Sequence, residues 1–335
     1  MIVNSQKMSI KEKILELFVE TNELSIKEIG DNLLVSKQAI HYAINQLLTE
    51  NRVEKIGRTP KTVYRVLKIS TNISVERLPQ ILETDNLFLK KNVLVITETG
   101  KMLDGLEGFD YWCKHRKLPL LKTIKEYIET KNRYNQYFGK YDLINGTEKL
   151  KNTKGYNSIW LDELFYLDFY AIERFGKTRL GTLLHYAKQG QNKMLMKVLV
   201  DEIKTTLLAF IKESKVDAVA FVPPTIRREV QIMKFLETHL KISLPVLKIN
   251  KISGIIPVPQ KSLNKLEERI RNAENSFSVT GNSKFEHLIL IDDAVGSGST
   301  MNEIAAKIKN KKIAGKITGI AVVGSFKGFD VITDV

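Results

Sequence analysis

Two adjacent carboxylates near the C-terminal end of this sequence are followed by a run of small residues. Asp292 and Asp293 come directly after the apolar run 288–291, and a Gly, Ser and Thr segment then opens a helical pattern. Such a loop presents main-chain N–H groups, hydroxyls and the positive end of a helix dipole to a phosphate. Because two carboxylates would repel a phosphate, we expect them to accept hydrogen bonds from a pair of sugar hydroxyls. The segment therefore predicts a site for a phosphorylated sugar.

A second segment suited to anions follows an earlier apolar run. Residues 217–222 are predicted to form a buried strand, after which the chain continues Pro223, Pro224, Thr225, Ile226, Arg227 and Arg228. Two guanidinium groups are well suited to a diphosphate, whose oxygens they bind in pairs. In an open parallel sheet, ligands bind at the carboxyl ends of the strands, and both segments begin there.

The two segments resemble the signature and the pyrophosphate loop of type I phosphoribosyltransferases, which bind 5-phosphoribosyl 1-pyrophosphate (PRPP). The signature has four apolar residues, two acids, two apolar residues and a Thr-Gly-x-Thr style loop, and residues 288–300 nearly match it. The resemblance implies an α/β fold, a parallel sheet with helices on both faces, and Mg²⁺ as a cofactor that binds with PRPP. It makes Asp292 and Asp293 the catalytic pair that holds the ribose hydroxyls, with no metal site in the protein itself.

The resemblance also assigns the other residues of the site. It gives binding of PRPP and its 5′-phosphate to Asp292, Asp293, Ala294, Val295, Gly296, Ser297, Gly298, Ser299 and Thr300. It gives pyrophosphate binding to Pro223, Pro224, Thr225, Arg227 and Arg228. Further residues narrow the resemblance to the ComF-like family, whose order is followed by Gln260, Leu263, Arg269, Asn272 and Phe277. The Tyr186-Ala187-Lys188 element is similar to another segment of that family. Lys177, Tyr186, Lys188 and Lys251 lie in or near the matched segments; a place facing the site is one interpretation, and surface or packing roles are the favoured one.

Two departures limit what this resemblance implies. ComF-like proteins usually begin with a four-cysteine zinc ribbon, and this chain has a single cysteine, Cys113. In 6-oxopurine phosphoribosyltransferases an aspartate stands where this chain has Gly296. The resemblance therefore argues against purine salvage of that type, and the acceptor base stays open.

Residues 8–68 carry three helical patterns followed by two short alternating strands. Ser9 with Glu12, and Ser25 with Glu28, have the spacing of capping boxes, and Ser36 opens the third helix. The strands 53–56 and 63–66 enclose the basic turn 57–61. This segment resembles an α+β winged helix-turn-helix domain. The resemblance implies DNA binding by Lys37, Gln38, His41, Tyr42 and Asn45 on the third helix and by Arg58 and Lys61 in the wing. A protein-protein module is the alternative.

Composition sets the wider frame. The chain has 335 residues and a formal net charge of +14, which suits a polyanionic partner. We expect three regions: residues 1–69 as the winged helix, a middle region 70–157 of unknown family with mixed helix and strand, and residues 158–335 as the phosphoribosyltransferase domain. Residues 145–157 have the composition of a linker. The middle region is rich in aromatic residues, which favour a core or interface over base stacking. Neither a signal peptide nor a membrane-spanning run occurs in the sequence, which predicts a cytoplasmic protein.

Three functions fit these predictions. In the first, a DNA-binding transcription regulator senses PRPP or a nucleoside 5′-phosphate without turning it over. The second is an active phosphoribosyltransferase recruited to nucleic acid. The third is a DNA-processing or phage-defence-associated effector whose winged helix holds a nucleoprotein partner. A homodimer is expected, because helix-turn-helix half-sites commonly repeat, and no membrane partner is expected.

Overall fold

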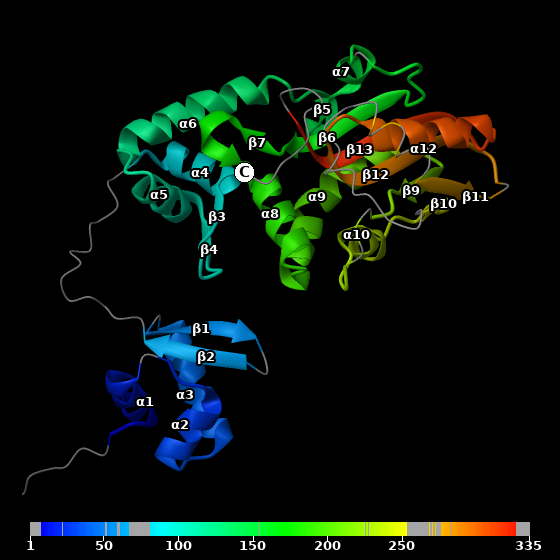
Figure 1. The fold of residues 1–335 in the computed structure, drawn as a ribbon. Coiled ribbons are helices and arrows are strands. Elements are labelled where there is room, and N and C mark those ends of the chain that lie inside the picture. The colour runs from blue at the N-terminus through cyan, green and yellow to red at the C-terminus, as the bar shows by residue number, and fades with distance from the viewer. Residues whose placement is uncertain are drawn as a thin grey trace, which may run out of the picture. The chain divides into compact units, whose positions relative to one another are not determined.

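The chain divides into two compact units. A computed structural model describes residues 8–21, 23–50, 52–58, 61–66, 81–153, 155–224, 226, 228–252, 268, 270, 272, 276–281 and 283–325. Unit 1 comprises Met1–Gln80 and unit 2 comprises Ile81–Val335 (Figure 1). Residues 81–157 of the expected middle region therefore belong to the same unit as the C-terminal sheet.

Unit 1 contains three helices and a two-stranded antiparallel sheet. The helices are α1 (Ile10–Glu20), α2 (Ile26–Leu33) and α3 (Lys37–Thr49), and the strands are β1 (Val53–Arg58) and β2 (Lys61–Val66). Both predicted capping boxes are present, and the Ser36 hydroxyl accepts the N–H of Ala39 at the start of α3. The helices of unit 1 enclose an apolar core, in which the side chains of Ile14, Ile40, Ile44 and Leu47 are buried.

Unit 2 is built on a five-stranded, mostly parallel sheet. Its strands are β5 (Ile144–Asn145), β6 (Glu163–Phe169), β9 (Ala218–Phe221), β12 (Phe285–Val295) and β13 (Ala314–Gly324), in the order β5-β6-β13-β12-β9. Only β5 is antiparallel to its neighbour. Parallel strands buried on both faces read as continuous apolar runs, which is why the runs of β9 and β12 were recognisable in the sequence.

Helices cover both faces of this sheet. The helix α12 (Ser299–Asn310) packs with Leu288 and Leu290 of β12. On the opposite face, α8 (Arg179–Gln189), α9 (Lys193–Glu213) and α10 (Ile232–Leu240) pack with Ile289 and Ile291 (Figure 1). The α/β architecture predicted from the sequence is therefore present.

The remaining elements of unit 2 lie before the sheet or between its strands in the sequence. They are α4 (Glu83–Asn92), β3 (Leu94–Ile96), β4 (Met102–Asp104), α5 (Gly105–His115), α6 (Leu120–Asn135), η1 (Lys140–Asp142), α7 (Thr147–Lys151), β7 (Ala171–Ile172), η2 (Glu173–Phe175), β8 (Gly176–Lys177), β10 (Lys248–Lys251) and β11 (Phe277–Thr280). Phe109, Tyr127 and Tyr134 are buried in the larger core cluster, as expected for packing aromatic residues. No helix among the described residues is long and apolar enough to cross a membrane.

The expected linker 145–157 is partly structured. It contains the last residue of β5 and all of α7, and the Leu150 side chain is fully buried. The Thr147 hydroxyl also accepts the N–H of Leu164 at 2.9 Å, which ties α7 to β6. The prediction of a linker was wrong because it rested on the polar composition of this stretch. Composition does not reveal that Leu150 is buried or that Thr147 is hydrogen-bonded to β6.

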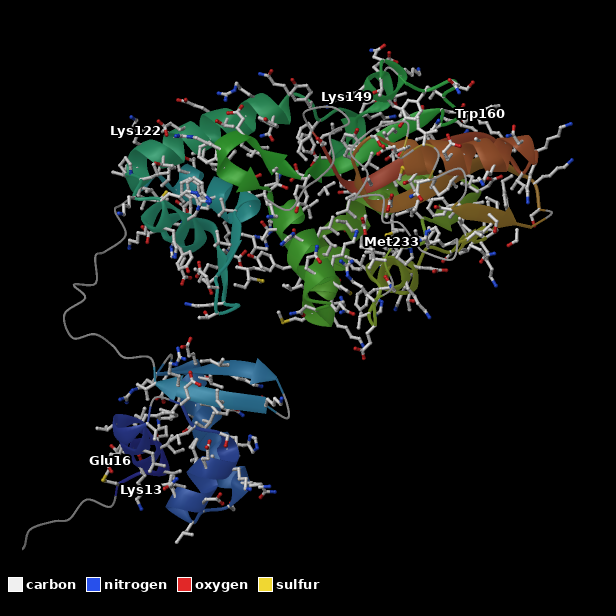
Figure 2. All side chains as sticks on the ribbon, viewed as in Figure 1. Lys13, Glu16, Lys122, Lys149, Trp160 and Met233 are labelled. Carbon is white, nitrogen blue, oxygen red and sulfur yellow. The ribbon has the colours of Figure 1, made fainter. Side chains whose placement is uncertain are left out.

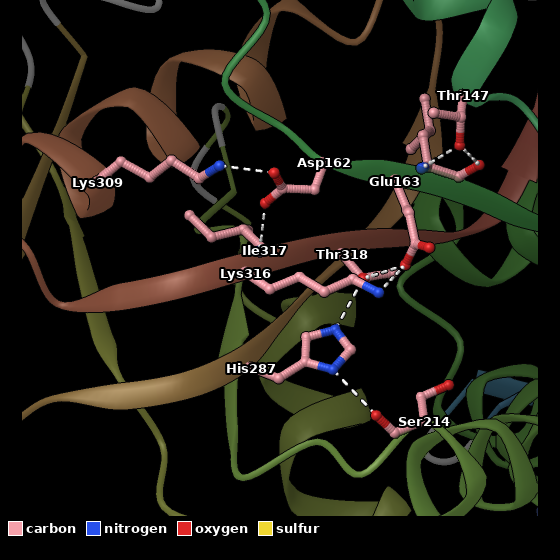
Figure 3. Close-up of polar contacts among 10 residues, drawn as sticks. Thr147, Asp162, Glu163, Ser214, His287, Lys309, Lys316, Ile317 and Thr318 are labelled. Carbon is pink, nitrogen blue, oxygen red and sulfur yellow. Dashed lines mark hydrogen bonds and ion pairs between the residues drawn. The ribbon is translucent and has the colours of Figure 1, made fainter.

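A hydrogen-bonded chain closes the amino ends of three neighbouring strands. His287 of β12 donates from Nδ1 to the Ser214 carbonyl oxygen at 3.0 Å, and its Nε2 lies 2.9 Å from the Thr318 hydroxyl of β13. Thr318 donates to Glu163 of β6 at 2.9 Å, and Lys316 pairs with the same carboxylate at 2.8 Å (Figure 3). Burial raises the pKa of Glu163, but the hydrogen bonds from Lys316 and Thr318 outweigh it and bring this pKa below its usual value.

Candidate functional site

The carboxyl ends of β9 and β12 mark the point where the connections of the sheet reverse. After β9 the chain passes through α10 and returns beside β9 in a parallel bridge between Val246 and Val219. After β12 it passes through α12, on the other face, to β13. In open α/β sheets, ligands bind outside the strand ends at such a switch point. Both anion-binding segments expected from the sequence begin there.

The acidic pair lies inside β12 rather than beyond its end. We expected the strand to stop at residue 291, but it continues to Val295, with Asp292 opposite Ala321 of β13. On its other side, β12 loses its partner sooner, because the last contact with the β9 segment is from the Val222 N–H to the Ile291 carbonyl. Pairing with β13 alone therefore keeps both acids extended and leaves one edge of β12 without a partner strand from β9.

The two carboxylates have different surroundings. The Asp293 side chain is buried, and its Oδ2 lies 2.6 Å from Lys188 Nζ on α8. Asp292 is partly exposed, and its Oδ1 accepts the N–H of Asp293 at 2.7 Å. Loss of solvent and the neighbouring Asp293 carboxylate raise the pKa of Asp292 well above its usual value, although Lys188 opposes the shift. A hydroxyl group that donates to these oxygens would replace the missing solvent.

The loop after β12 leaves the first turn of α12 open to a ligand. Gly298 precedes the helix with a φ of +79°, a left-handed conformation that favours glycine, and no side chain caps the helix. The N–H groups of Thr300 and Met301 donate to no other described residue. The Ser297 and Ser299 hydroxyls lie 3.0 Å apart. Free N–H groups at the positive end of a helix dipole are the chemistry that binds a phosphate.

Residues 156–161, which precede β6, hold this loop in place. The Tyr156 hydroxyl donates to the Ser297 carbonyl oxygen at 2.6 Å. The fully buried Asn302 of α12 accepts the N–H groups of Trp160 and Leu161 and donates to the Ser158 carbonyl (Figure 2 labels Trp160). Sequence reasoning missed both residues, since a lone Tyr in an apparent linker and an Asn within a helix give no signal of a long-range contact.

The expected pyrophosphate segment begins beside the acidic pair. Pro223 and Pro224 directly follow Val222, whose N–H bonds to β12 one residue before Asp292. Arg228 donates from Nη2 to the Gln189 side chain on α8 at 2.9 Å. Thr225 and Arg227 lie outside the described residues, as do Gln260, Leu263 and Arg269 of the ComF-like pattern. The described part of this segment is therefore joined to the helix that also carries Lys188.

The residues expected to bind DNA form an exposed set in unit 1. Every one of the five on α3 is exposed: Lys37, Gln38, His41, Tyr42 and Asn45. Lys61 begins β2 opposite Arg58 of β1, whose side chain lies outside the described part of the chain. Neither Lys37 nor Lys61 forms an ion pair with a described residue. This face is therefore free to meet an anionic partner.

Of Lys177, Lys188 and Lys251, which lie in or near the segments that resemble the ComF-like family, only Lys188 contacts the described part of this site, through Asp293. Lys177 and Tyr186 line a separate cavity of about 220 Å³, whose walls include Trp112 and Phe175. Among the described residues, no group of three His, Cys, Asp or Glu side chains could hold a metal ion.

No protein-family model matches this chain, and no curated protein is similar enough to count as a relative.

Proposed function

We propose that unit 2 binds PRPP or a nucleoside 5′-phosphate in the manner of a ComF-like type I phosphoribosyltransferase domain. The observation that carries this proposal is the arrangement at the switch point. Two adjacent carboxylates lie there and would accept the ribose hydroxyls, and the uncapped first turn of α12 follows them and would take the 5′-phosphate. The segment at Pro223 to Arg228 would receive the diphosphate of PRPP.

Mg²⁺ would bind with the ligand rather than in advance of it. Asp292 and Asp293 are the only acids in the described part of the site, and both are used by the ribose hydroxyls in this proposal. The oxygens of the diphosphate would therefore hold the ion. When bound, Mg²⁺ supplies positive charge that neutralises the diphosphate, and Arg228 adds to it from the protein side.

Calorimetry with PRPP and Mg²⁺ tests the proposed ligand. Asp292→Asn with Asp293→Asn removes two acceptors and should weaken binding by about a hundredfold or more, since hydroxyls then lose their charged partners. Asp201→Asn with Glu237→Gln is the matched control, because it removes the same charge from exposed residues of α9 and α10. Full affinity in the first double variant would place the site elsewhere.

We propose that the domain senses its ligand more than it turns the ligand over. Transfer requires an acceptor activated beside C1, and Gly296 offers no side chain for that task. Incubation with PRPP, Mg²⁺ and each common nucleobase should then release pyrophosphate no faster than the Asp292 and Asp293 double variant does. A base-dependent release that the double variant loses would favour the active phosphoribosyltransferase instead.

We propose that unit 1 is a winged helix-turn-helix that binds DNA, which makes the protein a ligand-sensing transcription regulator. The exposed polar face of α3 and the basic hairpin β1–β2 support this proposal. Replacing Arg58 and Lys61 with Ala should weaken DNA binding and reduce the slope of log K against log salt by about two units. Lys122→Ala with Lys125→Ala removes the same charge from exposed positions of α6 and should leave the slope unchanged.

The salt titration also separates the alternatives. An unchanged slope in the Arg58 and Lys61 variant would exclude this face from DNA binding and favour a protein or nucleoprotein partner. That partner is what a DNA-processing or phage-defence effector would require. The regulator proposal places the protein in the cytoplasm. It also makes the protein a homodimer, because two DNA-binding units on paired half-sites double the contact area with DNA.

A further inference from the structure

The last turn of α8 touches both halves of the proposed site. Lys188 pairs with Asp293 at 2.6 Å, and the next residue, Gln189, accepts a hydrogen bond from Arg228 at 2.9 Å. Gln191, just beyond the helix, accepts the N–H of Val230 at 2.8 Å. Two neighbouring side chains of one helical turn therefore reach two segments about 65 residues apart in the chain, one at each strand end.

Among the described residues, Asp293 forms its ion pair with Lys188. The Lys188 side chain is 26% exposed and that of Asp293 is 9% exposed, so their attraction is only partly screened by water. The other charged neighbour is Asp292 on the same strand, which repels it. The facing residues of β13, 321–324, and the nearby Phe221 and Val222 after β9 are uncharged, as are Ile232 and Met233 of α10.

Removing the ammonium group would leave two adjacent carboxylates with no nearby positive charge. The pKa of Asp292 would then rise further, because Lys188 opposes the rise that burial and the neighbouring Asp293 cause. A protonated pair has one free acceptor fewer for the two ribose hydroxyls, which are both donors in this arrangement. The charge of Lys188 therefore matters for ligand binding beyond any contribution to packing.

We propose that the last turn of α8 assembles the site: Lys188 is a positioning residue whose ammonium group holds the Asp293 side chain in place for the ribose hydroxyls, and Gln189 positions Arg228 for the diphosphate. This inference rests on the proposed function of unit 2. It assigns the two residues different roles: Lys188 supports binding of the ribose hydroxyls, and Gln189 supports binding of the diphosphate alone.

Two ligands separate these roles in the full-length protein. Ribose 5-phosphate carries the hydroxyls and the 5′-phosphate, whereas PRPP with Mg²⁺ adds the diphosphate. Lys188→Met should weaken both ligands by about tenfold at neutral pH and move the acid limb of the affinity profile to higher pH. Lys188→Arg should restore the profile, and Lys193→Met, at an exposed lysine of α9, should leave it unchanged.

Gln189 provides the second arm of the experiment. Gln189→Leu should weaken PRPP by about threefold to tenfold and leave ribose 5-phosphate unaffected, since only the diphosphate segment loses its tether. Equal losses for both ligands would overturn the role given to Gln189. If Lys188→Met fails to fold, Lys188→Gln carries the same test, because it keeps a donor near Asp293 and removes the charge.

The outcomes distinguish this inference from the function on which it rests. A wild-type protein that binds neither ligand would overturn the proposed function and this inference with it. Wild-type binding, with an unchanged pH profile in the folded Lys188→Met variant, would overturn the role of Lys188 alone. A shifted profile that Lys188→Arg restores supports it, because a loss of packing would not follow the charge.

Discussion

At the amino ends of β6, β13 and β12, Glu163, Thr318 and His287 form one continuous chain of hydrogen bonds between strands. At the carboxyl ends of β12 and β13, Asp292 uses one oxygen on a main-chain N–H, and the first turn of α12 keeps N–H groups without a described partner. Both ends place polar side chains near the same sheet. The amino end therefore uses its polar groups in contacts within the sheet, whereas the carboxyl end leaves bonding capacity that the proposed ligand would use.

The largest effect on stability should come from the contacts that fix the α12 loop, here called the brace: Tyr156 with Ser297, and Asn302 with residues 158–161. Asn302→Leu leaves the N–H groups of Trp160 and Leu161 and the Ser158 carbonyl without their partner, which should cost about 3 to 5 kcal/mol of unfolding free energy. Denaturant unfolding measures this cost. Asn250→Leu, at an exposed position of β10, is the control and should change stability by less than about 0.5 kcal/mol. Equal effects in the two variants would contradict the brace.

A smaller loss should follow from breaking the chain at the amino end. Thr318→Val keeps the shape of the side chain but removes the hydroxyl that links His287 to Glu163, at a cost of about 1 to 3 kcal/mol. Ligand affinity at the carboxyl end should stay unchanged in calorimetry. Thr205→Val on the exposed face of α9 serves as the control. Weaker ligand binding in folded Thr318→Val would show that the two ends are not separate in function.

The smallest effects concern pH and should have opposite signs at the two ends. The pKa of Asp292 is raised by folding, so wild-type stability falls as pH rises above the pKa of the unfolded carboxyl. Asp292→Asn should therefore gain stability relative to wild type as pH rises from about 4 toward neutral. The pKa of Glu163 is lowered by folding, so its contribution is present above the unfolded pKa and is lost as pH falls.

Glu163→Gln should accordingly lose stability relative to wild type at neutral pH, and the difference should shrink on acidification. Melting temperatures of both variants and wild type across this pH range measure the two signs. Asp201→Asn, which changes an exposed carboxylate of α9, is the control for general charge effects. The same sign in both variants would mean that the two ends of the sheet are electrostatically alike.

The sequence predicted the parts of the molecule that have local signals. Apolar runs predicted β9 and β12, and Ser and Glu spacing predicted the helix starts of unit 1, because these patterns report nearby burial and capping. It failed at the end of β12, where pairing with β13 extends the strand past an acidic pair that looks like a strand terminus. The roles of Lys188, Tyr156 and Asn302 depend on contacts between distant segments, for which a single sequence offers no signal.

The brace on the α12 loop has a consequence for the order of folding. Tyr156 and Ser297 are separated by 141 positions, and Trp160 and Asn302 by 142. Closing so long a segment costs entropy that only the completed parallel sheet repays, so these contacts should form late. A partly folded chain would contain α12 and its N–H groups without the brace that fixes their direction. Under the proposed function, a growing chain should therefore acquire ligand binding only after β13 has been added.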